Sequence, residues 1–254
     1  VSEIMLQQTR VEAVKPYFER FMGALPTVAD LAEVSDDRLM KLWEGLGYYS
    51  RARNLKKSAQ VIVEEYGGVI PADHQKLLKL PGIGSYTAGA IASIAFGIAV
   101  PAVDGNVLRV ISRVMASTED ILKPATRRKV ESLLQSVIPQ GRASEFNQGL
   151  IETGAIVCVP NGEPKCMVCP FESLCLAHRR NLTAQIPVKT PKKQRRIEER
   201  TVCILEDQSQ RIAIGKRPDQ GLLAGLYELP NADGQLEPEK LAEVFGFEPG
   251  QVIE

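Results

Sequence analysis

The stretch that most constrains the fold of this chain is residues 80–114, LPGIGSYTAGAIASIAFGIAVPAVDGNVLRVISRV. Gly82 and Gly84 lie in a Pro-Gly-Ile-Gly turn between two segments with helical periodicity, 74–80 and 85–97. Glycine lacks a Cβ atom, so it permits a positive φ and lets another backbone come close. We therefore predict a tight hairpin of two helices at this turn.

The glycine turn allows two functional interpretations. A helix that begins at Ser85 leaves backbone N–H groups unpaired, and these can bind a nucleic-acid phosphate without reading the bases. An ordinary helical corner is the alternative, with Leu80, Ile83 and Ala88 as its core. The motif alone leaves both open.

Asp104 follows a second turn and directly precedes the helical segment 105–114. Asp is a favoured N-cap residue, and the positive end of a helix favours the ionised carboxylate. Capping and catalysis are compatible, because a group that stays anionic can stabilise a developing cation. Asp104 is therefore a candidate catalytic residue.

Five motifs together carry a resemblance to a known family. They are SEIMLQQTRV at 2–11, GLGYYSRARNL at 45–55, LPGIGSYTAGAI at 80–91, VDGNVLRV at 103–110 and FNQGLIETGA at 146–155. The chain resembles the endonuclease III superfamily of DNA glycosylases and, within it, the A/G-specific adenine DNA glycosylases of the MutY family. The resemblance implies a mainly α, two-lobed helix-hairpin-helix fold and a monomer. It also implies base excision repair of adenine mispaired with 8-oxoguanine or guanine in double-stranded DNA.

The first motif supplies the general acid that the resemblance implies, Glu3. The periodicity predicts one helix from Val1 to Met22, and the residues alone favour a solvated polar face shared by Glu3, Gln7 and Arg10. Adenine leaves a deoxyribose poorly unless its N7 is protonated, and a carboxylic acid in apolar surroundings can supply that proton. By resemblance, Gln8 would wedge into the base stack beside the extruded nucleotide.

The second motif places two tyrosines beside two arginines in a connection between helices. Core and rim packing is the ordinary interpretation of Tyr48 and Tyr49. The alternative is stacking on bases while Arg51 and Arg53 hold phosphates. By resemblance, Tyr48 would intercalate next to the base opposite the target adenine. The hairpin residues that would contact DNA are Gly82, Gly84 and Ser85.

Tyr86 decides the predicted reaction type. Strand-cutting relatives carry a lysine at this position, whose amine forms a Schiff base with the sugar. We therefore predict a monofunctional hydrolase, with Tyr86 near the sugar and Asp104 stabilising or trapping an oxocarbenium-like cation. Asn106 and Gln148 could orient Asp104 and the reacting water, or could simply hydrogen-bond between helices.

Four of the five cysteines fall within 18 positions, as Cys158, Cys166, Cys169 and Cys175. Disulfides are not expected in a chain without a visible secretory signal. A zinc site is the alternative, although the spacing Cys-x₇-Cys-x₂-Cys-x₅-Cys lacks paired Cys-x₂-Cys arms. The resemblance implies a structural [4Fe-4S] cluster in the loop 158–175. We expect the fifth cysteine, Cys203, to be buried packing.

The chain divides into three predicted parts: a glycosylase domain over 1–186, a basic linker over 187–200 and a partial domain over 201–254. The formal net charge is zero, but the last part holds 4 basic and 10 acidic side chains, which leaves 27 against 21, a net +6, before it. That asymmetry is compatible with DNA binding. The last part resembles the start of the α+β Nudix-like domain with which the family checks for 8-oxoguanine. It lacks the acidic hydrolase box, so we predict no nucleotide hydrolysis.

No apolar run is long enough to span a bilayer, and no signal peptide is visible. We expect no membrane partner, and a location in the bacterial cytoplasm at the nucleoid or in a eukaryotic nucleus or mitochondrion. Because the chain opens inside a motif without Met, we expect a fragment. Two other functions stay open. A glycosylase-lyase for oxidised pyrimidines is disfavoured by Tyr86, and a non-catalytic DNA clamp is disfavoured by Glu3 and Asp104.

Overall fold

The computed structural model describes residues 1–191, 197–218 and 220–246, and the chain divides into two units, Val1–Pro191 and Lys192–Glu254. The α-helices of the first unit are α1 (Ser2–Met5), α2 (Val11–Ala24), α3 (Val28–Glu33), α4 (Asp36–Trp43), α5 (Ser50–Tyr66), α6 (His74–Leu77), α7 (Ser85–Ala90), α8 (Gly105–Val114), α9 (Pro124–Val137), α10 (Ala143–Glu152) and α11 (Leu176–Arg179). The π-helical turns η1 (Ile91–Ala95) and η2 (Thr153–Val157) extend α7 and α10, and the 3₁₀ turns η3 (Cys166–Val168) and η4 (Glu172–Leu174) follow. The mainly α fold is confirmed.

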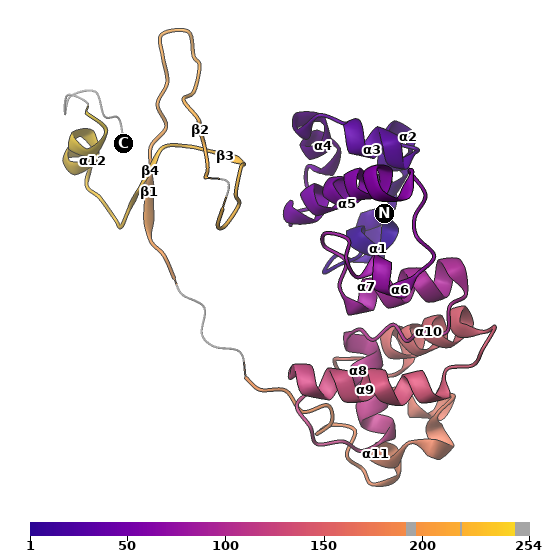
Figure 1. The fold of residues 1–254 in the computed structure, drawn as a ribbon. Helices are drawn as coiled ribbons and strands as arrows, with labels where there is room; N and C mark the ends of the chain where they lie inside the picture. Colours follow the sequence, from indigo (N-terminus) through magenta and orange to yellow (C-terminus); the bar gives the residue numbers. More distant parts are fainter. Residues whose placement is uncertain (192–196, 219, 247–254) are drawn as a thin grey trace. The chain divides into compact units, whose positions relative to one another are not determined.

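The first unit has two helical lobes joined through the hairpin of α6 and α7 (Figure 1). In one lobe, α1 to α5 enclose a core that includes Phe21 and Trp43, whose rings meet edge to face at 5.9 Å between centroids. In the other lobe, a core around Val103 and Val107 lies among α8, α9 and α10. Helix α1 contacts α2, α5 and α7, so the N-terminal segment meets the hairpin where the lobes join.

The single helix predicted for the first 22 residues is wrong. The chain forms α1 and α2, and between them Gln8 has a φ of 57°. Glu3, Gln7 and Arg10 therefore do not share one helical face. The helix stops because the buried guanidinium of Arg51 takes carbonyl groups that a longer helix would use.

The predicted hairpin is present, and only one of its two turn glycines needs glycine's conformational freedom. Gly82 has a φ of 75°, and a Cβ atom there would lie 2.7 Å from the Cβ of Asn54. Gly84 is the N-cap of α7 with a φ of −91°, and nothing lies within 4 Å of the Cβ it lacks. Sterically, the turn thus depends on Gly82 far more than on Gly84.

Gly89 of α7 packs directly on the backbone that leads into the second lobe. A Cβ atom at Gly89 would overlap the carbonyl oxygen of Pro101. We expect Gly89→Ala to destabilise the fold by about 1–3 kcal/mol, because neither backbone can move away cheaply. Gly149→Ala on α10 is the matched control, since nothing lies within 4 Å of its added methyl group. It should be neutral or stabilising by up to about 1 kcal/mol. Equal urea midpoints for the two variants would contradict this packing.

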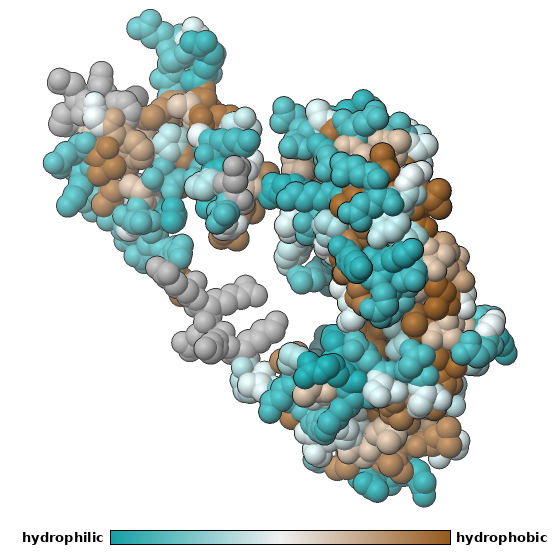
Figure 2. All heavy atoms as spheres, viewed as in Figure 1, coloured by the Kyte–Doolittle hydropathy of each residue, from teal (hydrophilic) through white to brown (hydrophobic). Residues whose placement is uncertain are grey.

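The second unit combines short strands with one helix. Strand β1 (Arg200–Val202) pairs antiparallel with β4 (Asn231–Asp233), β2 (Gly215–Lys216) pairs with β3 (Tyr227–Glu228), and α12 (Pro238–Phe245) follows. On the visible face of this unit, hydrophobic residues lie beside hydrophilic ones (Figure 2). Cys203 is half-buried rather than buried as predicted. Residues 192–196 of the predicted linker lie outside the described residues, and no helix within the described ranges is long and apolar enough to cross a bilayer.

Candidate active site

The side chains of Glu3 and Tyr86 meet although they lie 83 positions apart in the chain. Each belongs to the first turn of its helix, and the hydroxyl Oη of Tyr86 donates to Oε2 of Glu3 at 3.1 Å. Burial, followed by the charges of Glu3 and Asp104, raises the pKa of Tyr86 above its ordinary value. The phenol therefore stays protonated at neutral pH, and it acts as a hydrogen-bond donor to Glu3.

Asp104 is held by both of its carboxylate oxygens. Oδ1 accepts the backbone N–H of Val107 at 2.8 Å, which makes Asp104 the N-cap of α8 as predicted. Oδ2 accepts the side-chain amide of Asn106 at 2.8 Å. These two donors fix the orientation of the carboxylate. The charge of Asp104 also contributes to the raised pKa of Tyr86.

The buried side chain of Arg109 donates a hydrogen bond to Asn106 and so fixes its orientation. Nη2 of Arg109 donates to Oδ1 of Asn106 at 2.8 Å and to the carbonyl of Gly154 at 2.6 Å, while Nε donates to the carbonyl of Cys158 at 2.7 Å. A Cβ atom at Gly154 would lie 2.5 Å from the Cβ of Asn106, so the close approach requires glycine. The amide that orients Asp104 is thus fixed on two sides.

The structure does not bring Gln148 to Asp104. Gln148 is exposed, and its amide donates to Oγ of Ser144 on the same helix at 2.9 Å. The neighbouring Asn147 is fully buried instead, donates to the carbonyl of Val100 at 2.9 Å and accepts from the N–H of Ala102 at 2.9 Å. Asn147 thus fixes the segment before Asp104. Its signal in the sequence is an amide at helical spacing from the apolar residues Ala143 and Leu150.

The predicted phosphate contact of Arg51 is corrected by the structure. Arg51 is only 7% exposed, and its guanidinium binds backbone carbonyls inside the first lobe. Arg53 is half-buried. Gln8 and Tyr48 are exposed, with φ values of 57° and 49° that non-glycine residues rarely adopt. The hairpin residues Gly82, Gly84 and Ser85 are exposed as well.

A cleft of about 500 Å³ opens beside Asp104. Its lining includes Asp104, Asn106, Lys123, Arg127 and Lys189. Lys123 and Lys189 are exposed, whereas Arg127 donates to the carbonyl of Val103 and is half-buried. The wall next to the candidate catalytic carboxylate is therefore rich in cations.

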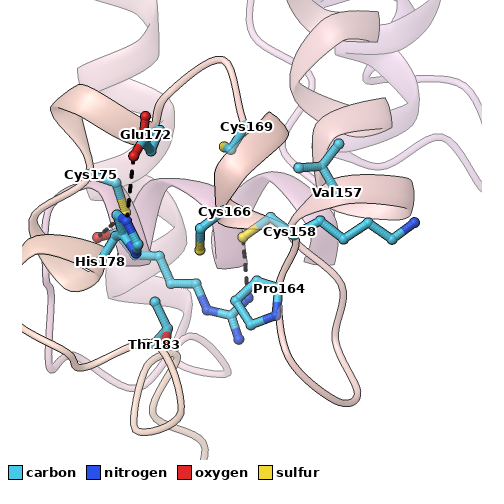
Figure 3. Close-up of a pocket in the computed structure, with 11 residues that line it drawn as sticks. Val157, Cys158, Pro164, Cys166, Cys169, Glu172, Cys175, His178 and Thr183 are labelled. Atoms are coloured by element: carbon cyan, nitrogen blue, oxygen red, sulfur yellow. Dashed lines mark hydrogen bonds and ion pairs between the residues drawn. The ribbon is translucent and has the colours of Figure 1, made fainter.

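The four predicted ligand cysteines line one pocket in the second lobe (Figure 3). Nη1 of the buried Arg113 donates to Sγ of Cys158 at 3.2 Å, and the thiol of Cys175 donates to the carbonyl of Arg113 at 3.4 Å. Burial, with the other cysteine sulfurs as further causes, raises the pKa of the Cys166 and Cys169 thiols. Among the described residues, no three His, Cys, Asp or Glu side chains are grouped closely enough to hold a single metal ion.

Residues 1–140 match the family model described as "HhH-GPD superfamily base excision DNA repair protein". The chain is 39% identical to an adenine DNA glycosylase of Homo sapiens, over 91% of this chain and 50% of that protein. It is 40% identical to one of Arabidopsis thaliana, over 91% of this chain and 41% of that protein. It is 33% identical to one of Buchnera aphidicola from Schizaphis graminum, over 93% and 68%. The chain spans about half the length of the first of these relatives.

Solved structures with the same fold are also similar in sequence. A thermostable thymine-DNA glycosylase superposes with a TM-score of 0.64 at 30% identity, over 70% of this chain and 82% of that one. A non-covalent endonuclease III–DNA complex superposes with a TM-score of 0.61 at 29% identity, over the same shares, 70% and 82%. Both relationships cover the larger part of this chain.

Proposed function

Because this chain belongs to the HhH-GPD superfamily of base excision DNA repair proteins, and within it to the family of the adenine DNA glycosylases, we propose that it hydrolyses the N-glycosidic bond of adenine in double-stranded DNA. The adenine would be mispaired with 8-oxoguanine or guanine. The observation that carries the proposal is the hydrogen bond from Tyr86 to Glu3, with the charge of Asp104 acting on the same phenol. The arrangement offers an acid and a fixed anion to one substrate.

In the proposed reaction, the protonated carboxyl of Glu3 gives its proton to N7 of an extruded adenine. The bond from C1′ to N9 then breaks, and its electron pair leaves with the purine. Tyr86 donates to the carboxylate that Glu3 has become, while Asp104 stabilises or traps the cation at C1′. Water then adds to C1′, displacing the Asp104 carboxylate where that group has bonded to C1′, and gives its proton to Glu3, which restores the acid. Since residue 86 is Tyr and not Lys, no Schiff base forms and the strand is not cut.

The cation-rich cleft beside Asp104 supports DNA as the partner. Lys123, Arg127 and Lys189 on its lining offer positive charge where the strand that carries the extruded nucleotide would pass. The exposed hairpin glycines and Ser85 would contact the backbone from the other side of the site, without reading bases. One of the structurally similar proteins is itself described as a DNA complex.

We infer that Cys158, Cys166, Cys169 and Cys175 hold a [4Fe-4S] cluster. Four soft thiol donors around one pocket suit such a cluster, and the Arg113 guanidinium that donates to sulfur would balance part of its negative charge. When bound, the cluster would cross-link the loop 158–175. No step of the proposed base hydrolysis passes through it.

We also propose a division of the chain into three parts. The glycosylase domain would cover 1–186, a basic linker 187–200, and a Nudix-like domain that checks for 8-oxoguanine would begin in 201–254. A monomer acting on nucleoid, nuclear or mitochondrial DNA fits this function. The short antiparallel strands and α12 are compatible with such an α+β domain.

One assay tests the proposed function against its two alternatives. The chain is incubated with duplexes that hold adenine opposite 8-oxoguanine, guanine or thymine, and free adenine and strand breaks are measured with and without alkali. We expect free adenine from the first two duplexes, and strand breaks only after alkali. Breaks without alkali would support a glycosylase-lyase instead. DNA binding without either product would support a non-catalytic clamp.

The cation-rich cleft yields a prediction about salt dependence. We expect the double variant Lys123→Ala/Lys189→Ala to bind DNA more weakly at low salt, with a log Kd against log salt slope reduced by about 2. Fluorescence anisotropy titrations over a range of salt concentrations measure this slope. The control is Lys15→Ala/Lys41→Ala, which removes two exposed lysines that pair with Glu12 and Glu44. If the slope of log Kd against log salt fell equally in the two double variants, the cleft would not be part of the DNA interface.

A further inference from the structure

We propose that Arg51 is a positioning residue that holds Gln8 and Tyr48 as one unit, so that both can enter the DNA at a fixed spacing. The inference rests on the proposed function, because it assigns Gln8 and Tyr48 to the DNA interface. Arg51 itself is 7% exposed and lies in the first turn of α5. It therefore acts through other residues and touches no substrate.

One guanidinium joins two separate turns of the chain. Nη1 donates to the carbonyls of Ile4 at 3.1 Å, Met5 at 2.7 Å and Gln7 at 2.6 Å. Nη2 donates to the carbonyls of Leu46 at 3.2 Å and Gly47 at 3.1 Å. The first three carbonyls lie at the end of α1 and just after it, and the last two lie just before α5. The fork geometry of Arg matches this set of acceptors, whereas a single ammonium cannot reach all five.

The contacts act on the two peptide planes that set the unusual backbone angles. The carbonyl of Gln7 belongs to the peptide group that precedes Gln8, and the carbonyl of Gly47 belongs to the one that precedes Tyr48. Both following residues have positive φ, 57° and 49°. Each such conformation costs about 1 kcal/mol or more, and it persists only where surrounding contacts determine it. Arg51 supplies a contact of this kind to both.

The nature of the contacts argues against simple core packing. The hydrogen-bond partners of the guanidinium are neutral carbonyls, and its Nε is buried without a hydrogen-bond partner. The guanidinium carbon also lies 5.4 Å from the ring centroids of Trp43 and of Tyr48. A well-packed apolar side chain is often at least as stabilising at such a buried site as a charged one. The charge is better explained by the geometry that it imposes on the two turns.

The outcome is a fixed pair of exposed side chains. Tyr48 is 58% exposed and Gln8 is exposed too, yet both backbones are tied to the same buried group. With a fixed spacing, a wedge at Gln8 and a stacking ring at Tyr48 would insert into the duplex in one docking step. Because Arg51 would hold both residues in place before DNA binds, less conformational entropy would be lost on binding.

The test compares Arg51→Lys with Arg38→Lys, an exposed arginine of α4 that serves as the control. Base extrusion is followed by the fluorescence of 2-aminopurine opposite 8-oxoguanine, and adenine release is measured in single turnovers. We expect Arg51→Lys to lower both by about tenfold or more while the Kd for DNA changes within about threefold. Arg38→Lys should match the wild type. Wild-type extrusion and release by Arg51→Lys would overturn the inference.

A double-mutant background separates positioning from general destabilisation. In the variant Gln8→Ala/Tyr48→Ala, Arg51→Lys should reduce adenine release by less than about twofold, because its targets are gone. An undiminished tenfold loss in that background would mean that Arg51 acts through the whole fold, which would overturn the inference. If the wild-type chain released no adenine, the proposed function would fail, and the next measurement would still decide the role of Arg51.

Hydrogen exchange in the free protein provides that measurement. We expect Arg51→Lys to speed amide exchange over residues 6–10 and 46–50 by about tenfold or more, with no change over α9. Unchanged exchange in both segments would overturn the inference. If Arg51→Lys did not fold, amide exchange in the wild-type protein would test the inference instead. Protection of these two segments equal to that of α5 would support the inference, and exchange as fast as in the loop 158–165 would overturn it.

Discussion

Asp104→Asn and Glu3→Gln are each expected to lower the single-turnover rate of adenine release by about 10³-fold. Asp104→Asn removes the negative charge but keeps an oxygen that can accept the N–H of Val107, so the N-cap of α8 and the fold survive. Glu3→Gln keeps an acceptor for Tyr86 and loses the proton that adenine needs. Glu3→Gln thus tests the protonation of adenine, and Asp104→Asn tests the stabilisation of the cation at C1′.

The measurement uses a duplex with adenine opposite 8-oxoguanine, with the enzyme in excess. The Kd for the same duplex should stay within about threefold of the wild-type value, because both changes keep the size of the side chain and leave the cations of the cleft in place. Glu12→Gln, an exposed carboxylate of α2, is the matched control and should leave the rate unchanged. Near-normal adenine release by either active-site variant would remove that residue from the chemistry. In the double variant, a loss no larger than that of Asp104→Asn would indicate that the two residues act together.

Replacing any one of the four pocket cysteines by Ser is expected to have the second largest effect. The loop that they occupy contains only the short turns η3 and η4, and Met167, Val168 and Leu174 are 86%, 70% and 65% exposed. A loop without a core of its own depends on its bound group, so we expect Cys166→Ser to lower the free energy of unfolding by several kcal/mol. The visible absorbance of an iron–sulfur cluster should disappear with it.

Elemental analysis checks this second prediction directly. The wild-type chain should hold about four irons and four acid-labile sulfides, and Cys166→Ser should hold far less of both. Cys203→Ser is the control, since Cys203 belongs to the other unit and should keep the full iron content. One zinc ion with no sulfide would replace the proposed cluster by the zinc site that the cysteines alone also allow. Cluster extrusion should lower Tm as the Ser variant does.

The sequence predicted the features that depend on local chemistry. Asp104 was recognisable as an N-cap because the helical pattern begins one residue later, and Gly82 because a Pro-Gly turn separates two periodic segments. The resemblance to a family assigned Glu3, Tyr86 and Asp104 to one site, but the hydrogen bond between Glu3 and Tyr86 was not predicted. It did not follow from any pattern in the residues, because periodicity gives no distance across 83 positions.

Features that depend on distant backbone groups were missed. In the sequence, Arg51 beside two tyrosines indicates a surface cation. Three of its five carbonyl partners lie more than 40 positions away, so no local pattern could reveal that its side chain is buried. The same contacts end the first helix early, which the apolar periodicity could not reveal. Gln148 and Asn147 differ by one position, and one position turns a side chain by about 100° around a helix. The buried amide was therefore the neighbour of the predicted one.

Arg109 links the cysteine pocket to the candidate catalytic carboxylate within the second lobe. A single planar group contacts the backbone of the first pocket cysteine, Cys158, and the amide that aims Asp104. A shift of the cysteine loop would therefore change the orientation of the carboxylate. We therefore expect loss of the proposed cluster to slow the chemical step before it weakens DNA binding.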